Sequence, residues 1–305
     1  MLKTSEIRAR DPFILAENGT YHLYVQSANR EGADFAGVEV YTSRDLRAWN
    51  PPAPVLVLPP GAGVTDVWAP EVHRHGEAYY LFVTLTFRDT LDEPPPVDAH
   101  YWPRMHRRGT WVFRAASPLG PFAPLQDAPH TPPGWMALDG TLFVEDGVPH
   151  MVFCHEWAQL VDGTMDVTRL SPDLSRAEGE PAALFKASDA PGAKTDPRDG
   201  KVTDGPFFHK SQKTGRLTMI WSTHIPGRGY CTFQTRSQTG RVAGPWGAHE
   251  PLFMGDGGHG MLFEDFNGRL LLALHQPNAE PLERMRLFEI RETGAGLGIA
   301  AEVET

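Results

Sequence analysis

The sequence predicts an all-β fold, a five-bladed β-propeller that takes up residues 1–305 as a single domain. A motif that pairs an acid or a histidine with a small residue or proline recurs five times, at intervals of about sixty residues. Each motif is followed by an apolar run, a turn and a second apolar run. Little of the chain has helical periodicity. We expect the blades to begin near residues 11, 69, 139, 204 and 258.

The first two strands of each expected blade form a hairpin. Turn residues stand between the two apolar runs, at Asn18-Gly19, Gly76, Asp146-Gly147, Gly215 and Asn267-Gly268. An Asn-Gly or Asp-Gly pair in this setting is a strong hairpin signal, because the favoured turns need positive φ. A third strand is expected in each repeat, at residues 38–41, 111–113, 165–167, 231–233 and 286–290. An open sandwich or two smaller β domains would also contain such strands, but would not explain why the acids recur in phase.

Composition narrows the class of partner. The formal net charge of −10 argues against nucleic acid or an anionic membrane surface as a partner. No run reaches the length of a transmembrane helix. The first six residues lack the apolar stretch of a secretory signal, so we expect a cytoplasmic protein, or a secreted one whose signal has been removed. Cys154 and Cys231 lie in strand-like runs and are expected to be buried thiols. The oligomeric state is left open.

Polar residues follow the second strand of each repeat. They are Ser27, residues 86–88, His155-Glu156-Trp157, His224 and His275-Gln276. Because the second strand returns to the end where the first began, these residues are expected on the same rim as Asp11, Asp139, Asp204 and His259. Two long irregular stretches, residues 89–109 and 187–201, are expected to wall or cover this rim. Together these patterns predict a binding pocket at the axis.

Carboxylates that meet across a pocket suit the hydrolysis of glycosides. One carboxyl group protonates the leaving oxygen, and the other activates water or attacks directly. The proton donor must keep its proton near neutral pH, although an unperturbed aspartate titrates near about 3.9. Burial and a neighbouring negative charge raise a carboxyl pKa, so a third acid beside the donor would help.

The motifs also resemble a known family. Arg10-Asp11-Pro12, Trp68-Ala69-Pro70-Glu71, Asp139-Gly140, Asp204-Gly205-Pro206 and Gly257-Gly258-His259-Gly260 are similar, in order and spacing, to motifs of family 43 of the glycoside hydrolases. The resemblance covers essentially the whole chain and implies a five-bladed propeller. It also implies an inverting glycosidase of arabinofuranosides, xylosides or their oligosaccharides. By position, Asp11 would be the general base, Asp139 would raise the pKa of the acid, and Asp204 would be the general acid.

The chain departs from the family pattern at the last of these residues. The family has glutamate before Gly-Pro, whereas this chain has Asp204. One methylene fewer withdraws the carboxyl group by roughly 1.5 Å. Either the blade advances to compensate, or another acid donates the proton, with Glu156 as the first substitute and Glu71 as the second.

His259 has three interpretations. In the resembling family the matching histidine lies near the axis and, in members that cleave arabinan, helps to hold a calcium ion together with water. Calcium prefers oxygen ligands, so a pocket hydrogen bond or a buried structural role are the alternatives. No other cofactor is expected. The residues predicted to contact the sugar substrate are Trp68, Glu71, His155, Trp157, Trp221, His224 and His275. Of the three tryptophans, two are expected to pack within blades.

Two other functions would use the same pocket. A non-catalytic sugar-binding propeller would keep the rim but lack a working proton donor, and Asp204 is the feature that favours it. A phosphorolytic relative would need a cationic phosphate site, for which Arg88, Arg104 and Arg107 are candidates. The resemblance favours α-L-arabinofuranosides or arabino-oligosaccharides as substrates.

Overall fold

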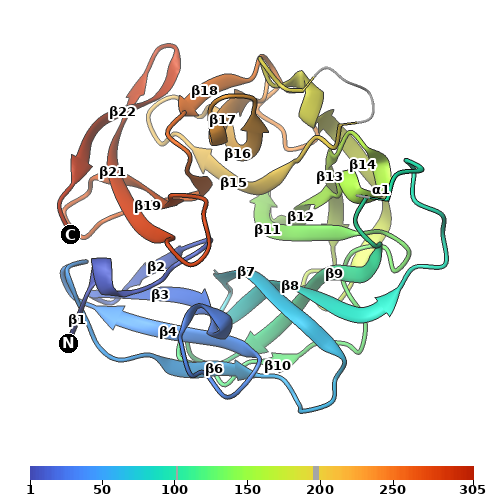
Figure 1. Cartoon of the computed structure of the whole chain (residues 1–305). Helices are drawn as coiled ribbons and strands as arrows, with labels where there is room; N and C mark the ends of the chain where they lie inside the picture. Colours follow the sequence, from blue (N-terminus) through green and yellow to red (C-terminus); the bar gives the residue numbers. More distant parts are fainter. Residues whose placement is uncertain (101, 195–198) are drawn as a thin grey trace.

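Each repeat of the sequence folds into one antiparallel sheet, and the sheets stand around an axis as blades (Figure 1). The computed structural model describes residues 1–100, 102–194 and 199–305, and these residues form five sheets. The predicted all-β, five-bladed propeller is therefore confirmed. The predicted turns hold as well, since Asn18-Gly19 and Asp146-Gly147 all have positive φ.

The strands run in chain order from the axis outward in blades 2 to 5 (Figure 1). Blade 1 comprises β1 (Leu2–Lys3), β2 (Phe13–Glu17), β3 (Thr20–Gln26), β4 (Gly37–Ser43), β5 (Ala48–Trp49) and β6 (Ala53–Val57). Blade 2 comprises β7 (Val64–His75), β8 (Ala78–Thr90), β9 (His106–Ala115) and β10 (Ala123–Pro124). Blade 3 comprises β11 (Ala137–Glu145), β12 (Val148–His155), β13 (Thr164–Leu170) and β14 (Ala177–Lys186).

Blade 4 comprises β15 (Asp204–Lys210), β16 (Leu217–Ile225), β17 (Gly229–Arg236) and β18 (Glu250–Phe253), and blade 5 comprises β19 (Gly258–Glu264), β20 (Leu270–Gln276), β21 (Arg284–Thr293) and β22 (Gly296–Val303). Helical segments are short, namely α1 (Trp157–Leu160), η1 (Thr4–Glu6), η2 (Ser27–Asn29) and η3 (Ala187–Asp189). Among the described residues, no helix is long and apolar enough to cross a membrane.

Each blade has one residue in the left-handed conformation in its inner strand or, in blade 1, just before it. The residues are Asp11, Ala69, Asp139, Gly205 and His259, with φ of 51°, 46°, 56°, 51° and 48°. In blades 2 to 5 the pairing of the first two strands shifts register at this point, as in a β-bulge. A non-glycine residue held in this region costs about 1–3 kcal/mol, and such strain is concentrated at functional sites.

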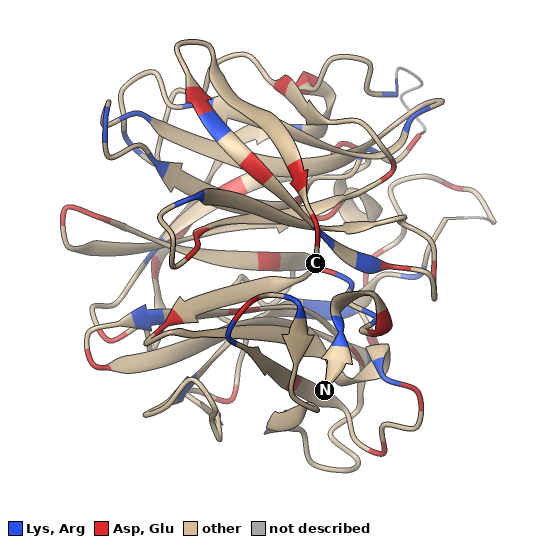
Figure 2. Ribbon diagram, turned by 90° about the vertical axis from the view of Figure 1, so that its left-hand side faces the viewer, with Lys and Arg blue, Asp and Glu red and all other residues tan. Residues whose placement is uncertain are grey.

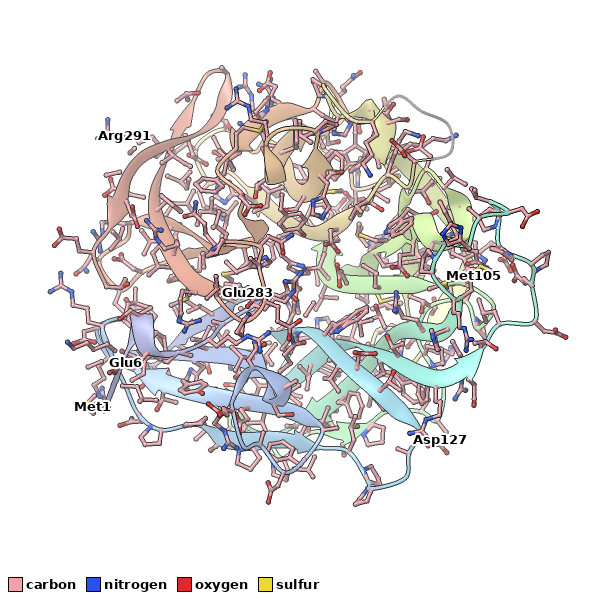
Figure 3. The ribbon with its side chains drawn as sticks, in the orientation of Figure 1. Met1, Glu6, Met105, Asp127, Glu283 and Arg291 are labelled. Carbon is pink, nitrogen blue, oxygen red and sulfur yellow. The ribbon has the colours of Figure 1, made fainter. Side chains whose placement is uncertain are left out.

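The ring closes where blade 5 meets blade 1. Blade 5 consists of β19 to β22, and β1 pairs with β5 inside blade 1, so the junction consists of an isolated β-bridge between Arg8 and Arg284 together with side-chain contacts. The carboxylate of Glu283, which is fully buried, accepts hydrogen bonds from Arg8 (3.2 Å) and Arg10 (3.0 Å). Figure 3 labels Glu283 at this junction, near the axis. The ring of Tyr21 also meets that of Phe263 edge-on, with centroids 6.2 Å apart.

Apolar side chains fill the space between neighbouring blades. Fully buried rings include those of Trp49, Tyr24, Phe82, Phe153 and Trp221. Both cysteines are buried and free, as the sequence predicted. Acidic and basic residues are interspersed along the strands and loops seen from the side (Figure 2). The chemistry of the molecule therefore depends on what the blades hold at the axis.

Candidate active site

A cavity of about 1310 Å³ lies at the end of the propeller where the inner strands begin. Of the predicted site residues, eight line it, namely Asp11, Trp68, Asp139, Glu156, Trp157, Asp204, His224 and His259. Below it, the ring of Phe13 contacts those of His73 and Phe207, with centroids 5.3 Å and 6.1 Å away. These rings from three blades meet across the axis beneath the acids.

Asp11, Asp139 and Asp204 come from blades 1, 3 and 4 and converge on this cavity. The Nδ1 atom of His259, from blade 5, lies 3.3 Å from Oδ1 of Asp11 and 3.8 Å from Oδ2 of Asp139. One imidazole nitrogen thus lies within 4 Å of two carboxylates. Ligand atoms of Asp139, Asp204 and His259 all lie within 4.8 Å of one another.

The left-handed residues are tied to the blade before them through their backbone N–H groups. That of Asp139 donates to the hydroxyl of Thr84 (2.9 Å), and that of His259 donates to the hydroxyl of Ser222 (2.9 Å). The N–H of Asp11 donates to Nδ1 of His275 (3.2 Å), across the ring closure. Three side chains at equivalent places on second strands therefore hold the left-handed bulges.

Blade 4 departs from this pattern. Cys154 occupies the equivalent place in blade 3, because it pairs with Leu138 as Ser222 pairs with Asp204. A thiol is a weak hydrogen-bond acceptor. The N–H of Gly205 donates instead to Oδ2 of Asp139, at 3.1 Å. This bond brings the start of blade 4 against the carboxylate of blade 3.

The environments of the three acids separate their pKa values. Burial by itself would raise the pKa of Asp11, but His259 and Arg10 favour its charged form, and this pKa lies well below its ordinary value. Burial raises the pKa of Asp139 to about 6. Burial and the charge of Asp139 raise the pKa of Asp204 well above its ordinary value. The surroundings therefore favour the charged form of Asp11 and the protonated form of Asp204.

Glu156 lies in the same cavity but has a cationic partner. Arg108 donates to Oε2 of Glu156 and, through Nε, to the hydroxyl of Thr86 (2.8 Å). The guanidinium of Arg108 also lies over the ring of Trp68, 4.2 Å from its centroid. Burial raises the pKa of Glu156, whereas Arg108 opposes this effect. Glu156 and Trp68 are thereby held in fixed positions on the cavity wall.

Four predicted substrate-binding residues are not brought to the cavity. Trp221 is fully buried in blade 4, where its Nε1–H donates to Nδ1 of His249 (3.0 Å). The ring of His155 stacks on Trp135 with centroids 4.0 Å apart. The positions of Trp221 and His155 follow from the alternation of side chains along a strand, which places successive residues on opposite faces of a blade.

The other two lie behind or beneath the acids. His275 is fully buried, and its Nε2 lies 3.2 Å from Oδ1 of Asn278, which fits the tautomer that leaves Nδ1 free to accept from Asp11. Glu71 lies two residues beyond the left-handed Ala69, is buried, and has its Oε2 2.8 Å from Nε2 of His73. His275 therefore acts on the site through Asp11, and Glu71 is not among the residues that line the cavity, although its charge contributes to the raised pKa of Asp139.

The two long loops meet beside Trp157. The indole of Trp102, from the first loop, contacts that of Trp157 edge-on, with centroids 5.2 Å apart. Gly200, from the second loop, packs so closely on Trp157 that a Cβ atom there would lie 2.0 Å from Cε3. All three residues line the cavity, which supports the predicted role of the loops as walls. Tyr101 and residues 195–198 of these loops lie outside the described residues.

The site contains residues that the sequence did not single out. Tyr230 donates from its hydroxyl to Oδ2 of Asp204 (2.6 Å), and Arg10 lines the cavity with Nε 4.0 Å from Oδ2 of Asp11. In the sequence, Tyr230 has no feature that separates it from other residues of a third strand. Arg10 precedes the acid of its motif, and only that acid was predicted to be catalytic. The three arginines considered for a phosphate site, Arg88, Arg104 and Arg107, are not among the described residues that line the cavity.

The donor set around His259 does not match calcium. Calcium takes six to eight oxygen ligands, whereas this group offers one imidazole and two carboxyl groups. One oxygen of each carboxyl group already accepts a hydrogen bond, Oδ2 of Asp139 from Gly205 and Oδ2 of Asp204 from Tyr230. Nδ1 of His259 faces Asp11. The contacts favour the interpretation of His259 as a hydrogen-bonding residue of the pocket.

Comparison with known proteins adds an independent result. The family model described as "Glycosyl hydrolases family 43" matches residues 4–295. An endo-arabinase from Bacteroides thetaiotaomicron is 34% identical, with 96% of this chain and 98% of that chain covered and a TM-score of 0.81. No curated protein matches the chain.

Two more distant structures share the fold. An α-L-arabinofuranosidase from Lactobacillus brevis is 16% identical, with 96% and 93% coverage and a TM-score of 0.75. An exo-1,5-α-L-arabinanase from a bovine ruminal metagenomic library is 16% identical, with full coverage of both chains and a TM-score of 0.71. Taken with the three converging acids and the length of the family match, these results show that the chain belongs to family 43 of the glycosyl hydrolases and is a glycosidase.

Proposed function

We propose that this glycosidase hydrolyses α-L-arabinofuranosyl linkages in arabino-oligosaccharides or arabinan, with inversion at the anomeric carbon. Asp11 is the general base, Asp204 the general acid, and Asp139 keeps Asp204 protonated. The observation that carries the proposal is the opposite direction of two pKa shifts in one cavity, downward for Asp11 and upward for Asp204. Carboxyl groups whose environments push their pKa values apart divide the acid and base roles between them.

The reaction then takes one concerted displacement. Asp204 transfers its proton to the glycosidic oxygen as the bond from that oxygen to the anomeric carbon breaks. Asp11 accepts a proton from a water molecule whose oxygen forms the new bond to the anomeric carbon, on the opposite face of the sugar. His275 and His259 hold Asp11 in place, and Asp139 keeps its charge beside Asp204.

Two observations support an oligomeric arabinose substrate. The cavity of about 1310 Å³ exceeds the volume of about 300–1000 Å³ that suits a drug-sized ligand, so it leaves room for more than one pentose unit. The structure with 34% identity is described as an endo-arabinase. Trp68, Trp157 and the half-exposed edge of His224 are the side chains that would contact neighbouring sugar units.

Asp204 is a better proton donor than Glu156 in this arrangement. Glu156 accepts a hydrogen bond from Arg108, which stabilises its charged form, whereas Asp204 lies beside the second carboxyl group of Asp139. We assign to Glu156 a hydrogen bond to a substrate hydroxyl group. Its pairing with Arg108 fits that role, because the carboxylate is then an acceptor of fixed orientation.

Aryl α-L-arabinofuranosides with good and poor leaving groups test the assignment. Asp204→Asn should lose about 10²–10⁴-fold in kcat on a phenyl glycoside, and much of that loss should vanish on a dinitrophenyl glycoside. Asp11→Asn should lose activity on both, and Glu156→Gln should mainly raise KM. NMR of the first-formed sugar reports the anomer. Retention of configuration, or leaving-group rescue of Glu156→Gln in place of Asp204→Asn, would refute the assignment.

A further inference from the structure

Tyr230 lies between the two catalytic acids in the chain of contacts. Its hydroxyl donates to Oδ2 of Asp204 across 2.6 Å. Its ring stacks on the imidazole of His275, with centroids 5.6 Å apart and planes 15° from parallel, and His275 accepts the N–H of Asp11. Tyr230 is buried, so its hydroxyl group is shielded from solvent.

The position of Tyr230 is tightly fixed. Its N–H donates to Oδ1 of Asp256 (3.1 Å), and its carbonyl accepts from Gly257 (2.9 Å). The backbone of Gly258 lies so close to the ring that a Cβ atom there would be 2.6 Å from Cε1. His224 lies opposite Tyr230 on the neighbouring strand, with ring centroids 5.0 Å apart. The hydroxyl group cannot retreat from Asp204 without moving two blades.

We propose that Tyr230 is the positioning residue that adapts this site to an aspartate, where glutamate would be one methylene longer. The inference rests on the proposed role of Asp204 as general acid. A hydroxyl group 2.6 Å from Oδ2 fixes that oxygen and leaves the other for the proton. A glutamate would carry its carboxyl group roughly 1.5 Å further, into the region that the tyrosine hydroxyl restricts.

The proposal predicts that Tyr230→Phe lowers activity when residue 204 is aspartate and raises activity when residue 204 is glutamate. In the wild type, Tyr230→Phe should lower kcat on a phenyl α-L-arabinofuranoside by about ten- to a hundredfold, because a misplacement near 1 Å costs about that much. Activity on the dinitrophenyl glycoside should change far less. In an Asp204→Glu background, the same Tyr230→Phe change should raise activity, because it makes room for the longer side chain.

Tyr79→Phe is the matched control, because the hydroxyl of Tyr79 also donates to a carboxylate, that of Glu17, away from the cavity. It should lower activity in neither background. Equal losses from Tyr230→Phe with aspartate and with glutamate at position 204 would overturn the proposal, since a merely structural role would reduce both. If Asp204→Asn keeps full activity on the phenyl glycoside, the proposed acid fails, which is a different result.

A measurement without turnover separates the two outcomes further. A carbon-13 NMR titration of the Asp204 carboxyl group should give a higher pKa in Tyr230→Phe, because the hydroxyl group donates to the charged form. This shift tests the contact even if aryl glycosides prove poor substrates. An Asp204 pKa that is unchanged by the substitution would show that Tyr230 does not hold this carboxyl group.

Discussion

The backbone N–H of Gly205 donates a 3.1 Å hydrogen bond to Oδ2 of Asp139, and this bond joins the start of blade 4 to the acid of blade 3. In three other places a side chain on a second strand accepts the corresponding N–H, as Thr84 does for Asp139 itself. At the blade 3 position the side chain is Cys154, a poor acceptor. The N–H of Gly205 is therefore available to the carboxylate of Asp139, next to Asp204, the proposed proton donor.

Cys154→Ser tests this exchange of partners. A serine hydroxyl would compete for the N–H of Gly205, and Asp139 would lose a donor that stabilises its charge, so its pKa should rise. A hydrogen bond worth about 1 kcal/mol corresponds to about fivefold in kcat/KM on the acid side of the optimum. Kinetics across pH measure the effect. Cys231→Ser is the control, since that thiol is equally buried but bonds to carbonyl groups of residues 228 and 229. An equal loss in both variants would contradict the prediction.

Asp139→Asn should displace the pH profile of kcat/KM to lower pH. The pKa of Asp139 is raised to about 6 by burial, so we expect the acid limb of the wild type near that pH. The variant lacks this titration. Its amide also removes the negative charge that disfavours ionised Asp204, so the pKa of Asp204 falls and the alkaline limb moves to lower pH. An alkaline limb that stays in place, or moves upward, would show that Asp139 does not control the acid.

Gly200→Ala should disturb sugar binding more than chemistry. The added methyl group would displace the ring of Trp157, which lines the cavity. An aromatic contact is worth about 0.5–1.5 kcal/mol, so KM for arabino-oligosaccharides should rise up to about tenfold with little change in kcat. Gly134→Ala is the control, because nothing lies within 4 Å of a Cβ atom there. Unchanged KM in Gly200→Ala would mean that Trp157 does not contact the substrate.

Glu283→Gln should weaken the ring closure. The carboxylate is fully buried and serves Arg8 and Arg10, whose side chains are 18% and 32% exposed. Loss of hydrogen bonds to a charged group should lower the free energy of unfolding by about 2 kcal/mol, which urea titration can measure. Glu302→Gln removes an exposed pairing with Arg286 on β21 and should cost about 0.5 kcal/mol or less. Comparable losses in the two variants would argue against a special role for the junction.

The fold could be predicted because its signals are local. Turn pairs such as Asn18-Gly19 and the recurring acid motifs lie next to the strands that they delimit. In blade 2 the acid of the motif, Glu71, lies two residues beyond the left-handed Ala69, whereas in blades 1 and 3 the acid itself has this conformation. A bulge adds one residue to a strand, so the side chains that follow it point to the opposite face of the sheet. The pattern of apolar residues in the sequence does not reveal this change.

The same reasoning limits what could be said of the site. Asp11, Asp139 and Asp204 lie in distinctive motifs. Tyr230 and Arg108 belong to third strands, whose residues carry no such motif. Rim position alone could not separate His224, which lines the cavity, from His275, which is buried behind it. Their places depend on contacts between blades, which no single stretch of sequence contains.

The five left-handed positions carry different side chains although their backbones are alike. Around the ring they present a carboxylate, a methyl group, a carboxylate, a bare glycine and an imidazole, from Asp11 to His259. A ring of five equal groups would accept a sugar in five equivalent rotations. With the unequal set, only one orientation of the sugar brings both the water and the leaving group next to a suitable side chain. The nearly symmetric scaffold therefore binds the substrate in one productive orientation.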